Sequence, residues 1–375
     1  MQFSIGSTIT GDKSCCYNWE PDTKTFVKST TCSNNILEFK DLVVLSELLS
    51  DQDILNIFPG KEYTSVFEEQ LGIKNTNKDK IPWESCLSSR VFHKRLNDLG
   101  NYLINHEQDL KYYLGYYQQS NSCLTDLVSL NNPQFILNHP TATSFYPDAS
   151  GDLDIPVYNR TTSITGRLKI VSGPEILSLE KTLRLDLLKN RCFELDFNAI
   201  EPRLLYVLAT GKPVSSSDDF YMIVKRDLNL NNLIRDQVKH LVLCTLYGSD
   251  TEQDNILEYF NIEEFREKLI DERTKQQDGS ITNWFGRRIK PPVKNSNIIN
   301  YYVQSTAIDF VLLCFSWLIK NHQETIKPVF ILIDALYGLN NSNLPDIAIL
   351  NKTIKQLTNS MFPGSEFPVK LSCLN

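Results

Sequence analysis

The sequence predicts an α+β fold, and three observations support this prediction. Two short apolar runs of the strand type, residues 192–197 and 329–334, each carry an aspartate at or near their end. Segments with apolar residues at helical spacing lie before and between these runs. The chain has 375 residues, of which 41% are hydrophobic. Because domains usually have roughly 100–200 residues, a chain of this length is expected to form two or three folding units.

Composition and charge exclude several classes of protein. The 38 Lys and Arg residues are outnumbered by 45 Asp and Glu residues, giving a net charge of −7. Any binding of nucleic acid must therefore come from a local basic patch rather than from overall charge. The nine cysteines are odd in number and form no Cys-x-x-Cys pair. This pattern argues against a disulfide scaffold and a structural zinc site, and favours a reduced intracellular setting.

Targeting and membrane signals are weak in this sequence. The first residues lack a basic flank followed by an apolar stretch, so no signal peptide is expected. The longest largely apolar run, residues 310–319, is too short to cross a bilayer. We therefore expect a soluble, intracellular protein with no membrane partner.

The first half of the chain gives uneven structural signals. Residues 1–80 contain only short apolar pieces interrupted by Asn, Ser, Thr and Asp. Residues 83–130 carry apolar positions at helical spacing, which predicts two or more amphipathic helices. Residues 131–156 are rich in Asn, Pro, Thr, Ser, Asp and Gly and predict a connection or hairpin.

The second half gives clearer signals. The strand at 192–197 is followed by a predicted helix with Pro202 in its first turn and Gly211 past its end. A further helix is predicted from about residue 231 to 247, where Gly248 stops it. A long helix over about residues 298–320 precedes the second strand.

Asp196 and Asp334 are the first candidates for chemistry. A carboxylate beside apolar sequence is costly unless it is exposed, paired or bound to a metal. Taken singly, each aspartate is most simply explained as a turn former at a strand end. Taken together, the two predict a shared site for a divalent cation, since Mg²⁺ is typically held by one or two carboxylates and substrate phosphates.

The helix at 231–247 carries a second pattern. Arg235, Lys239, Leu243 and Tyr247 are four residues apart and share one helical face. Two cations, an apolar residue and an aromatic on one stripe predict a surface that grips a triphosphate and stacks on its base and sugar. The alternative is a solvated basic edge on an ordinary helix.

These segments also resemble the motifs of a known family when they are taken in chain order. The five segments are Thr165-Gly166-Arg167-Leu168, Asp196-Phe197-Asn198-Ala199-Ile200-Glu201-Pro202-Arg203, Arg235-x3-Lys239-x3-Leu243-x3-Tyr247-Gly248, Asn300-x3-Gln304-Ser305-Thr306-Ala307-x-Asp309 and Ile333-Asp334-Ala335. In order and spacing they resemble family A DNA polymerases, the group typified by bacterial DNA polymerase I. The second, third and fifth segments correspond to motifs A, B and C of that family.

The resemblance implies a right-hand polymerase fold in a compact form without an exonuclease domain. Such a fold has an antiparallel palm sheet, helical fingers and, here, a reduced helical thumb. The implied division of the chain is an N-terminal region of unknown role at 1–82, the thumb and a connection at 83–155, the first part of the palm at 156–211, the fingers at 212–283 and the second part of the palm at 284–375.

The same resemblance implies metal ligands and a proton donor. Asp196, Asp334 and the backbone carbonyl of Phe197 would hold two Mg²⁺ ions, with Mn²⁺ as a substitute, for an in-line displacement. Lys239 would donate a proton to the departing pyrophosphate. The residues implied to bind the deoxynucleoside triphosphate are Arg235, Lys239, Leu243, Tyr247 and Glu201, the last of which would exclude a 2′-hydroxyl. The residues implied to bind DNA are Arg167, Gly248, Arg287, Arg288, Asn300 and Gln304.

Some positions depart from the family pattern. Leu243 stands where motif B usually has Phe or Tyr, so stacking there is expected to differ. Ile333 and Ala335 replace the His and Glu of motif C, which leaves Asp334 as the only hard ligand of that hairpin. The 155 residues before the palm are too few for an exonuclease and a thumb, so no 3′–5′ editing is expected. Glu194 matches nothing in the motif, and a structural ion pair is its expected role.

The expected function is that of a DNA-templated DNA polymerase that uses primer-template DNA and deoxynucleoside triphosphates. Replication accessory proteins are further candidate partners. The compact size is typical of a viral, phage or mobile-element enzyme, in which case the site of action would be the cytoplasm of a bacterial host, or of a repair or translesion enzyme. Two alternatives remain open. One is a single-subunit RNA polymerase, against which Glu201 and the turn at 165–168 argue. The other is a catalytically inactive, polymerase-like DNA-binding or replication accessory protein.

Overall fold

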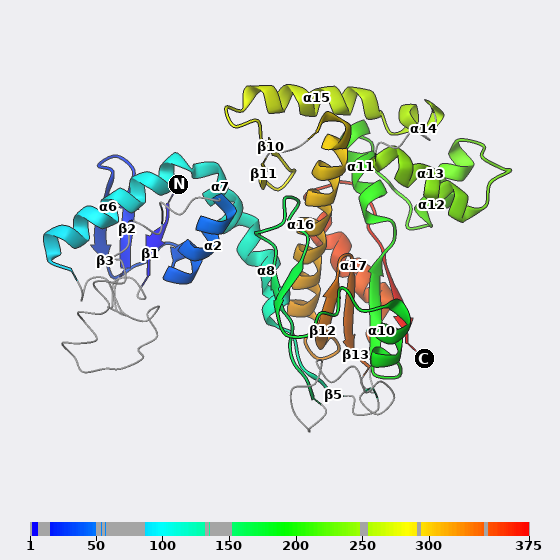
Figure 1. The fold of residues 1–375 in the computed structure, drawn as a ribbon, viewed down its shortest axis with the longest axis horizontal. Helices are drawn as coiled ribbons and strands as arrows, with labels where there is room; N and C mark the ends of the chain where they lie inside the picture. Colours follow the sequence, from blue (N-terminus) through cyan, green and yellow to red (C-terminus); the bar gives the residue numbers. More distant parts are fainter. Residues whose placement is uncertain are drawn as a thin grey trace. The chain divides into compact units, whose positions relative to one another are not determined.

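The chain forms two compact units, residues 1–115 and 116–375. The computed structural model shown in Figure 1 describes residues 2–6, 16–49, 54, 57, 87–131, 135, 152–247, 254–290, 294–340 and 344–374. The mixture of helices and antiparallel strands confirms the predicted α+β class.

The N-terminal unit contains a four-stranded sheet with helices beside it. Its strands have the order β3-β2-β1-β4, in which β4 runs parallel to β1 and the other pairs are antiparallel. The elements are β1 (Ser4–Ile5), β2 (Cys16–Glu20), β3 (Thr25–Ser29), β4 (Ile36–Leu37), α2 (Phe39–Leu49), α6 (Ser89–Asn105) and α7 (Glu107–Tyr112). A π-helical segment, Tyr113–Tyr117, spans the boundary between the units.

The position of α6 decides where the first compact unit ends. Its apolar face is buried, and Gly100 lets the helix approach Trp19 so closely that a Cβ there would lie 2.1 Å from the indole ring. Both α6 and α7 therefore belong to the core of the N-terminal unit. The first compact unit extends to residue 115, because α6 is buried against its sheet.

The N-terminal unit also contains a disulfide bond between Cys16 and Cys32. The cysteine spacing predicted reduced cysteines throughout, because no pattern in the sequence distinguishes this pair. Within the described ranges the other cysteines are free: Cys123, Cys192, Cys244, Cys314 and Cys373.

The C-terminal unit is built on a four-stranded antiparallel sheet. Its strands have the order β12-β13-β9-β14, so the last strand of the chain lies beside β9 at the edge. The bounds are β9 (Cys192–Phe197), β12 (Pro328–Leu332), β13 (Ala335–Leu339) and β14 (Val369–Cys373). This sheet brings together the two predicted strands that carry aspartates.

Alternation along β9 separates an apolar face from a face that carries acidic side chains. Phe193, Leu195 and Phe197 are buried on one face, and the Phe197 ring lies 5.9 Å from that of Phe310 on α16 (Ile298–Asn321). Glu194 and Asp196 point to the other face, because successive residues of a strand alternate. The sheet and α16 therefore fix the position of Asp196 through the packing of its neighbours.

Helix α16 is the central helix of this unit and confirms the helix predicted at about 298–320. The segment Asn295–Asn321 is long and apolar enough to cross a membrane, but 89% of its apolar window is buried inside the unit. That environment is the one expected for a core helix. Helix α8 (Gln118–Thr125) packs along α16, and α17 (Ile347–Thr358) packs against α16 and β14.

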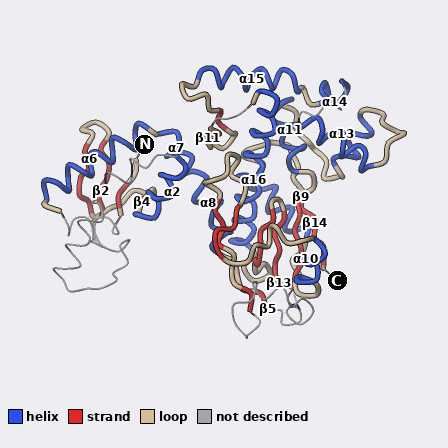
Figure 2. Tube along the Cα trace, in the orientation of Figure 1, coloured by secondary structure: helices blue, strands red, loops and turns tan. Residues whose placement is uncertain are grey.

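A second group of helices lies around one end of α16 and shares a hydrophobic cluster with it. Figure 2 shows that helices dominate this part, whereas strands gather around β9, β13 and β14. The helices are α11 (Ile200–Thr210), α12 (Phe220–Asp227), α13 (Arg235–Tyr247), α14 (Asp254–Tyr259) and α15 (Ile262–Lys275). Pro202 lies in the first turn of α11 and Gly211 ends it with a left-handed φ of 68°, as the sequence predicted.

Short paired strands and two further helical segments complete the unit. They are β5 (Leu130–Asn131) with β6 (Asp152–Leu153), β7 (Val157–Asn159) with β8 (Lys169–Ser172), β10 (Ile281–Thr282) with β11 (Arg288–Ile289), helix α10 (Lys181–Leu188) and the 3₁₀ segment Asn295–Asn297.

Candidate functional site

Asp196 and Asp334 lie side by side at the ends of neighbouring strands. Asp196 is opposite Ala335 in the β9–β13 pair, and Asp334 is the residue before Ala335. The turn between β12 and β13 consists of Ile333 and Asp334, and the backbone N–H of Phe197 donates to the Asp334 carbonyl at 3.3 Å. The sheet thus brings together the two aspartates that the sequence analysis singled out.

Backbone with a positive φ lies directly before Asp334 and three residues after Asp196. Ile333 has a φ of 56° and Ala199 a φ of 54°, and neither residue is a glycine. A β-branched residue with positive φ is uncommon, and such strain costs about 1–3 kcal/mol and is concentrated at functional sites. The strained positions therefore mark the same end of the sheet as the carboxylates do.

The two carboxylates have raised pKa values. Burial, followed by the charges of Asp334 and Glu194, raises the pKa of Asp196 to about 7, against the opposing effect of Lys370 and Lys239. Burial also raises the pKa of Asp334, while the charges of Arg167 and Lys239 favour its ionised form. Among the described residues, no lysine or arginine forms an ion pair with either carboxylate. A bound cation would relieve this unfavourable charge.

These pKa values predict how stability depends on pH without metal. Native Asp196 keeps its proton up to about pH 7, whereas the unfolded carboxyl group loses it near its ordinary value of 3.8. The native state therefore binds more protons between these values, so this group lowers the free energy of unfolding as pH rises from about 4 to about 7. Urea unfolding in EDTA at pH 5 and pH 7.5 measures the effect.

The difference between wild type and Asp196→Asn isolates this contribution from those of other groups. We expect the stability of Asp196→Asn to fall less than that of wild type between pH 5 and pH 7.5. Asp271→Asn, at an exposed position of α15, should show the same fall as wild type. An equal pH dependence in wild type and Asp196→Asn would contradict the raised pKa.

The donor set fits a hard divalent cation held by few protein ligands. In the described ranges, no group of three or more His, Cys, Asp or Glu side chains could hold a metal ion. Glu194 accepts a hydrogen bond from the Tyr337 hydroxyl instead of forming the expected ion pair, and Glu201 faces Arg167. Two adjacent carboxylates, one of which raises the pKa of the other, suit Mg²⁺, which usually keeps several waters and shares substrate phosphates.

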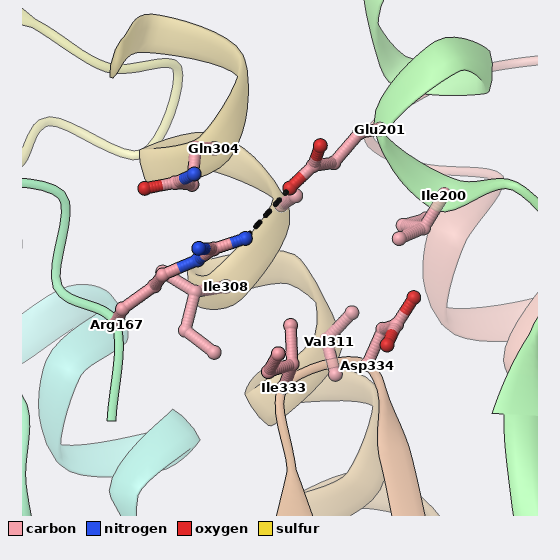
Figure 3. Close-up of a pocket in the computed structure, with 9 residues that line it drawn as sticks. Arg167, Ile200, Glu201, Gln304, Ile308, Val311, Ile333 and Asp334 are labelled. Carbon is pink, nitrogen blue, oxygen red and sulfur yellow. Dashed lines mark ion pairs between the residues drawn. The ribbon is translucent and has the colours of Figure 1, made fainter. Parts of the chain in front are cut away.

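A small pocket lies beside Asp334. It has a volume of about 20 Å³, room for about one water molecule. Figure 3 shows the Arg167 guanidinium directed at the Glu201 carboxylate, with Gln304 beside them and Asp334 across the pocket. The Arg167 Nη2 and Glu201 Oε1 atoms are 3.8 Å apart. The apolar lining residues are Ile200, Ala307, Ile308, Val311 and Ile333.

The turn that presents Arg167 is attached to α16. Thr165 Oγ1 donates to Gln304 Oε1 at 2.7 Å, and Gly166 has a φ of 78°. A Cβ at Gly166 would lie 2.7 Å from Cζ of Arg287, so only glycine fits both the conformation and the space. The structure therefore explains why the second residue of the Thr-Gly-Arg motif is a glycine.

The two cationic side chains of α13, Arg235 and Lys239, lie in different environments. Arg235 donates from Nε to Asp219 Oδ2 at 2.8 Å, and its guanidinium lies over the Tyr221 ring at 5.2 Å from the centroid. Lys239 is exposed one turn further on, and its charge acts on both Asp196 and Asp334. Leu243 is half-buried against the hydrophobic cluster. The helix ends at Tyr247, whose side chain, like Gly248, lies outside the described residues.

The structure contradicts the assignment of Arg287 to DNA binding. Its side chain is 4% exposed; Nε lies 3.5 Å from Asp309 Oδ2, and Nη1 donates to the Arg160 carbonyl. A guanidinium enclosed in this way cannot reach a phosphate backbone. Arg288 is half-buried, with Nη1 3.4 Å from Asp278 Oδ2, and Asn300 is half-buried in the first turn of α16.

Three features of this region could not be predicted from the sequence. Lys370 is opposite Asp196 in the β9–β14 pair, although no motif includes it. Asp219, the N-cap of α12, holds Arg235. Asp309 lies in a matched segment, but its buried partner Arg160 carries no sequence signal. All three depend on strand register or on contacts between distant segments, which local spacing does not reveal.

Comparisons with known proteins give a distant structural likeness. No protein-family model matches the sequence. No curated protein matches it either. Among solved structures, the chain is similar to the POL domain of Pol1 from M. smegmatis in complex with DNA primer-template and dNTP. The two chains share 15% sequence identity with a TM-score of 0.45, and the match covers 88% of this chain. It covers 66% of the other chain, so this chain spans slightly less than two thirds of it.

Proposed function

We propose that this chain is a template-directed DNA polymerase that adds deoxynucleotides to a primer 3′-hydroxyl by two-metal-ion nucleotidyl transfer. The observation that carries the proposal is the adjacency of Asp196 and Asp334 at the ends of β9 and the β12–β13 turn. The five motif segments supply the supporting pattern in the sequence. The proposed enzyme acts without 3′–5′ proofreading.

The proposed metal ligands are the carboxylates of Asp196 and Asp334 and the carbonyl of Phe197. Bound Mg²⁺, or Mn²⁺ in its place, would activate the primer hydroxyl and neutralise charge on the leaving pyrophosphate. The raised pKa of both carboxylates supports this assignment, because a cation stabilises their ionised forms. Lys239, whose charge reaches both carboxylates, is the proposed proton donor to pyrophosphate.

The remaining residues bind and orient the substrates in this proposal. Arg235 and Lys239 bind the triphosphate from one face of α13. Arg167 and Gln304, with Asn300 on the same helix as Gln304, contact the minor groove at the primer end, where acceptors common to all base pairs are displayed. Glu201 occupies the space that a ribose 2′-hydroxyl would need, and Arg167 holds its carboxylate in place.

The direct test is primer extension by the purified full chain. We expect extension with deoxynucleoside triphosphates in Mg²⁺, and none in EDTA. Equal use of ribonucleotides by wild type would favour the RNA polymerase alternative. Binding of primer-template DNA without extension in either Mg²⁺ or Mn²⁺ would favour the inactive accessory protein.

Replacing Glu201 by alanine tests the proposed sugar selection. Glu201→Ala should raise the efficiency of ribonucleotide incorporation by about 10²-fold or more relative to deoxynucleotides, because the excluded volume is removed. The comparison uses kcat/KM for matched nucleotide pairs. Glu194→Gln serves as the control, since Glu194 is hydrogen-bonded to Tyr337 away from the pocket. Unchanged discrimination in Glu201→Ala would contradict the assignment.

A further inference from the structure

Lys370 lies next to the carboxylate pair on the edge strand of the sheet. In the antiparallel β9–β14 pair it is the direct partner of Asp196. Direct partners project to the same face with Cβ atoms about 5 Å apart. The Lys370 side chain is 57% exposed, and its charge lowers the pKa of Asp196. An exposed lysine is thus available at the edge of the proposed metal site.

Lys370 and Arg235 converge on one oxygen atom. Arg235 Nε and Nη2 each lie 2.8 Å from Asp219 Oδ2, and Lys370 Nζ lies 3.9 Å from the same oxygen. Arg235 comes from α13 and Lys370 from β14, so the two cations approach from different elements. A carboxylate oxygen held between two cations occupies the kind of position that a phosphate oxygen would take.

On the basis of the proposed function, we propose that Lys370 is a phosphate-binding residue of the nucleotide site. Lys370 and Arg235 form a two-cation cradle, which Asp219 fills when no nucleotide is bound. An incoming triphosphate would replace the Asp219 carboxylate between the two cations. Lys370 would thereby connect the triphosphate to the strand that carries Asp196. Asp219 is then a competitor of the nucleotide rather than a ligand of it.

The competing explanation is that Lys370 only offsets the negative charge of Asp196. In that case its loss would change the carboxylate pair but not the binding of a polyphosphate in the absence of metal. Replacement of Asp219 would strengthen polyphosphate binding through Arg235 in either case, so the Lys370 variants carry the distinction. The two explanations therefore differ in a measurement that requires neither metal nor catalysis.

The experiment measures binding of inorganic tripolyphosphate to the full chain by calorimetry in metal-free buffer. Lys370→Met should weaken binding by about tenfold, the loss of one charge-assisted contact, and Lys370→Arg should restore most of it. Asp219→Asn should strengthen binding by severalfold, because the competing charge is removed while asparagine still caps α12. Lys268→Met, at an exposed position of α15, is the matched control for loss of one lysine.

Primer extension by the same variants separates this inference from the proposed function. We expect Lys370→Met to raise the KM for the nucleotide by about tenfold. The affinity of this variant for primer-template DNA should change less. If wild type extends primers but Lys370→Met changes neither KM nor tripolyphosphate binding, the cradle is wrong. If wild type extends no primer yet tripolyphosphate binding depends on Lys370 and Asp219 as described, the cradle stands and the polymerase assignment fails.

Discussion

Replacing either Asp196 or Asp334 by asparagine is expected to lower primer extension by about 10³-fold or more. Metal ions at such a site supply several kcal/mol of transition-state stabilisation, and each 1.36 kcal/mol corresponds to about a tenfold change in rate. Asparagine keeps the shape of the side chain but loses the charge that holds the cation. Single-turnover extension with saturating nucleotide measures the loss in the chemical step.

The same substitutions are expected to affect stability in the opposite direction. In EDTA the two carboxylates are half-buried and the charge of Asp334 raises the pKa of Asp196, so neutralising either one should raise the free energy of unfolding. Lower activity with equal or higher stability distinguishes loss of a functional group from loss of the fold. Glu267→Gln, at an exposed position of α15, is the control for loss of one carboxylate away from the site. Extension that survives in both aspartate variants would refute the metal assignment.

The sequence predicted the central elements of the C-terminal unit because local signals determine them. Alternating apolar residues define β9, and Pro202 and Gly211 define the ends of the next helix. The pairing of Asp196 with the Asp334 turn is a long-range feature, yet it followed from the position of each residue at a strand end. The order of the motifs along the chain also predicted that the two aspartates meet, although several helices separate them in the sequence.

The features that were not predicted depend on contacts between segments that are distant in the sequence. Arg287 precedes other basic residues and therefore resembles a phosphate-binding stretch, but Asp309 holds it inside the unit. The register that places Lys370 opposite Asp196 cannot be read from a five-residue strand. The boundary after residue 115 reflects burial of α6 on a sheet whose short strands left only weak sequence signals.

Replacing Asp309 is expected to cause a large loss of stability. It is 1% exposed on α16, and Arg160, which is fully buried, donates to its Oδ1 at 2.6 Å. Its second oxygen accepts a hydrogen bond from Asn283 at 2.8 Å and faces Arg287. The Arg160 guanidinium also donates to Ser120 and lies over the Tyr117 ring. The carboxylate therefore joins three segments around α16.

Asp309→Ala should lower the free energy of unfolding by about 3–5 kcal/mol, because it leaves buried guanidinium charge without its carboxylate. Asp309→Asn should recover only part of this loss, since its amide would direct a donor at groups that are themselves donors. Urea unfolding measures both effects. Asp271→Ala, at an exposed position, should stay within about 0.5 kcal/mol of wild type. A loss below about 1 kcal/mol in Asp309→Ala would contradict the buried network.

The network also connects stability to the proposed site. Arg160 begins the segment that leads to Arg167, and Arg287 packs on Gly166 within the same turn. Loss of Asp309 should therefore displace Arg167 from Glu201 even in molecules that remain folded. At a temperature where Asp309→Asn is fully native, primer extension should fall and discrimination against ribonucleotides should weaken, as in Glu201→Ala. A variant that is destabilised but retains full discrimination would show that the buried network supports the fold without positioning Arg167.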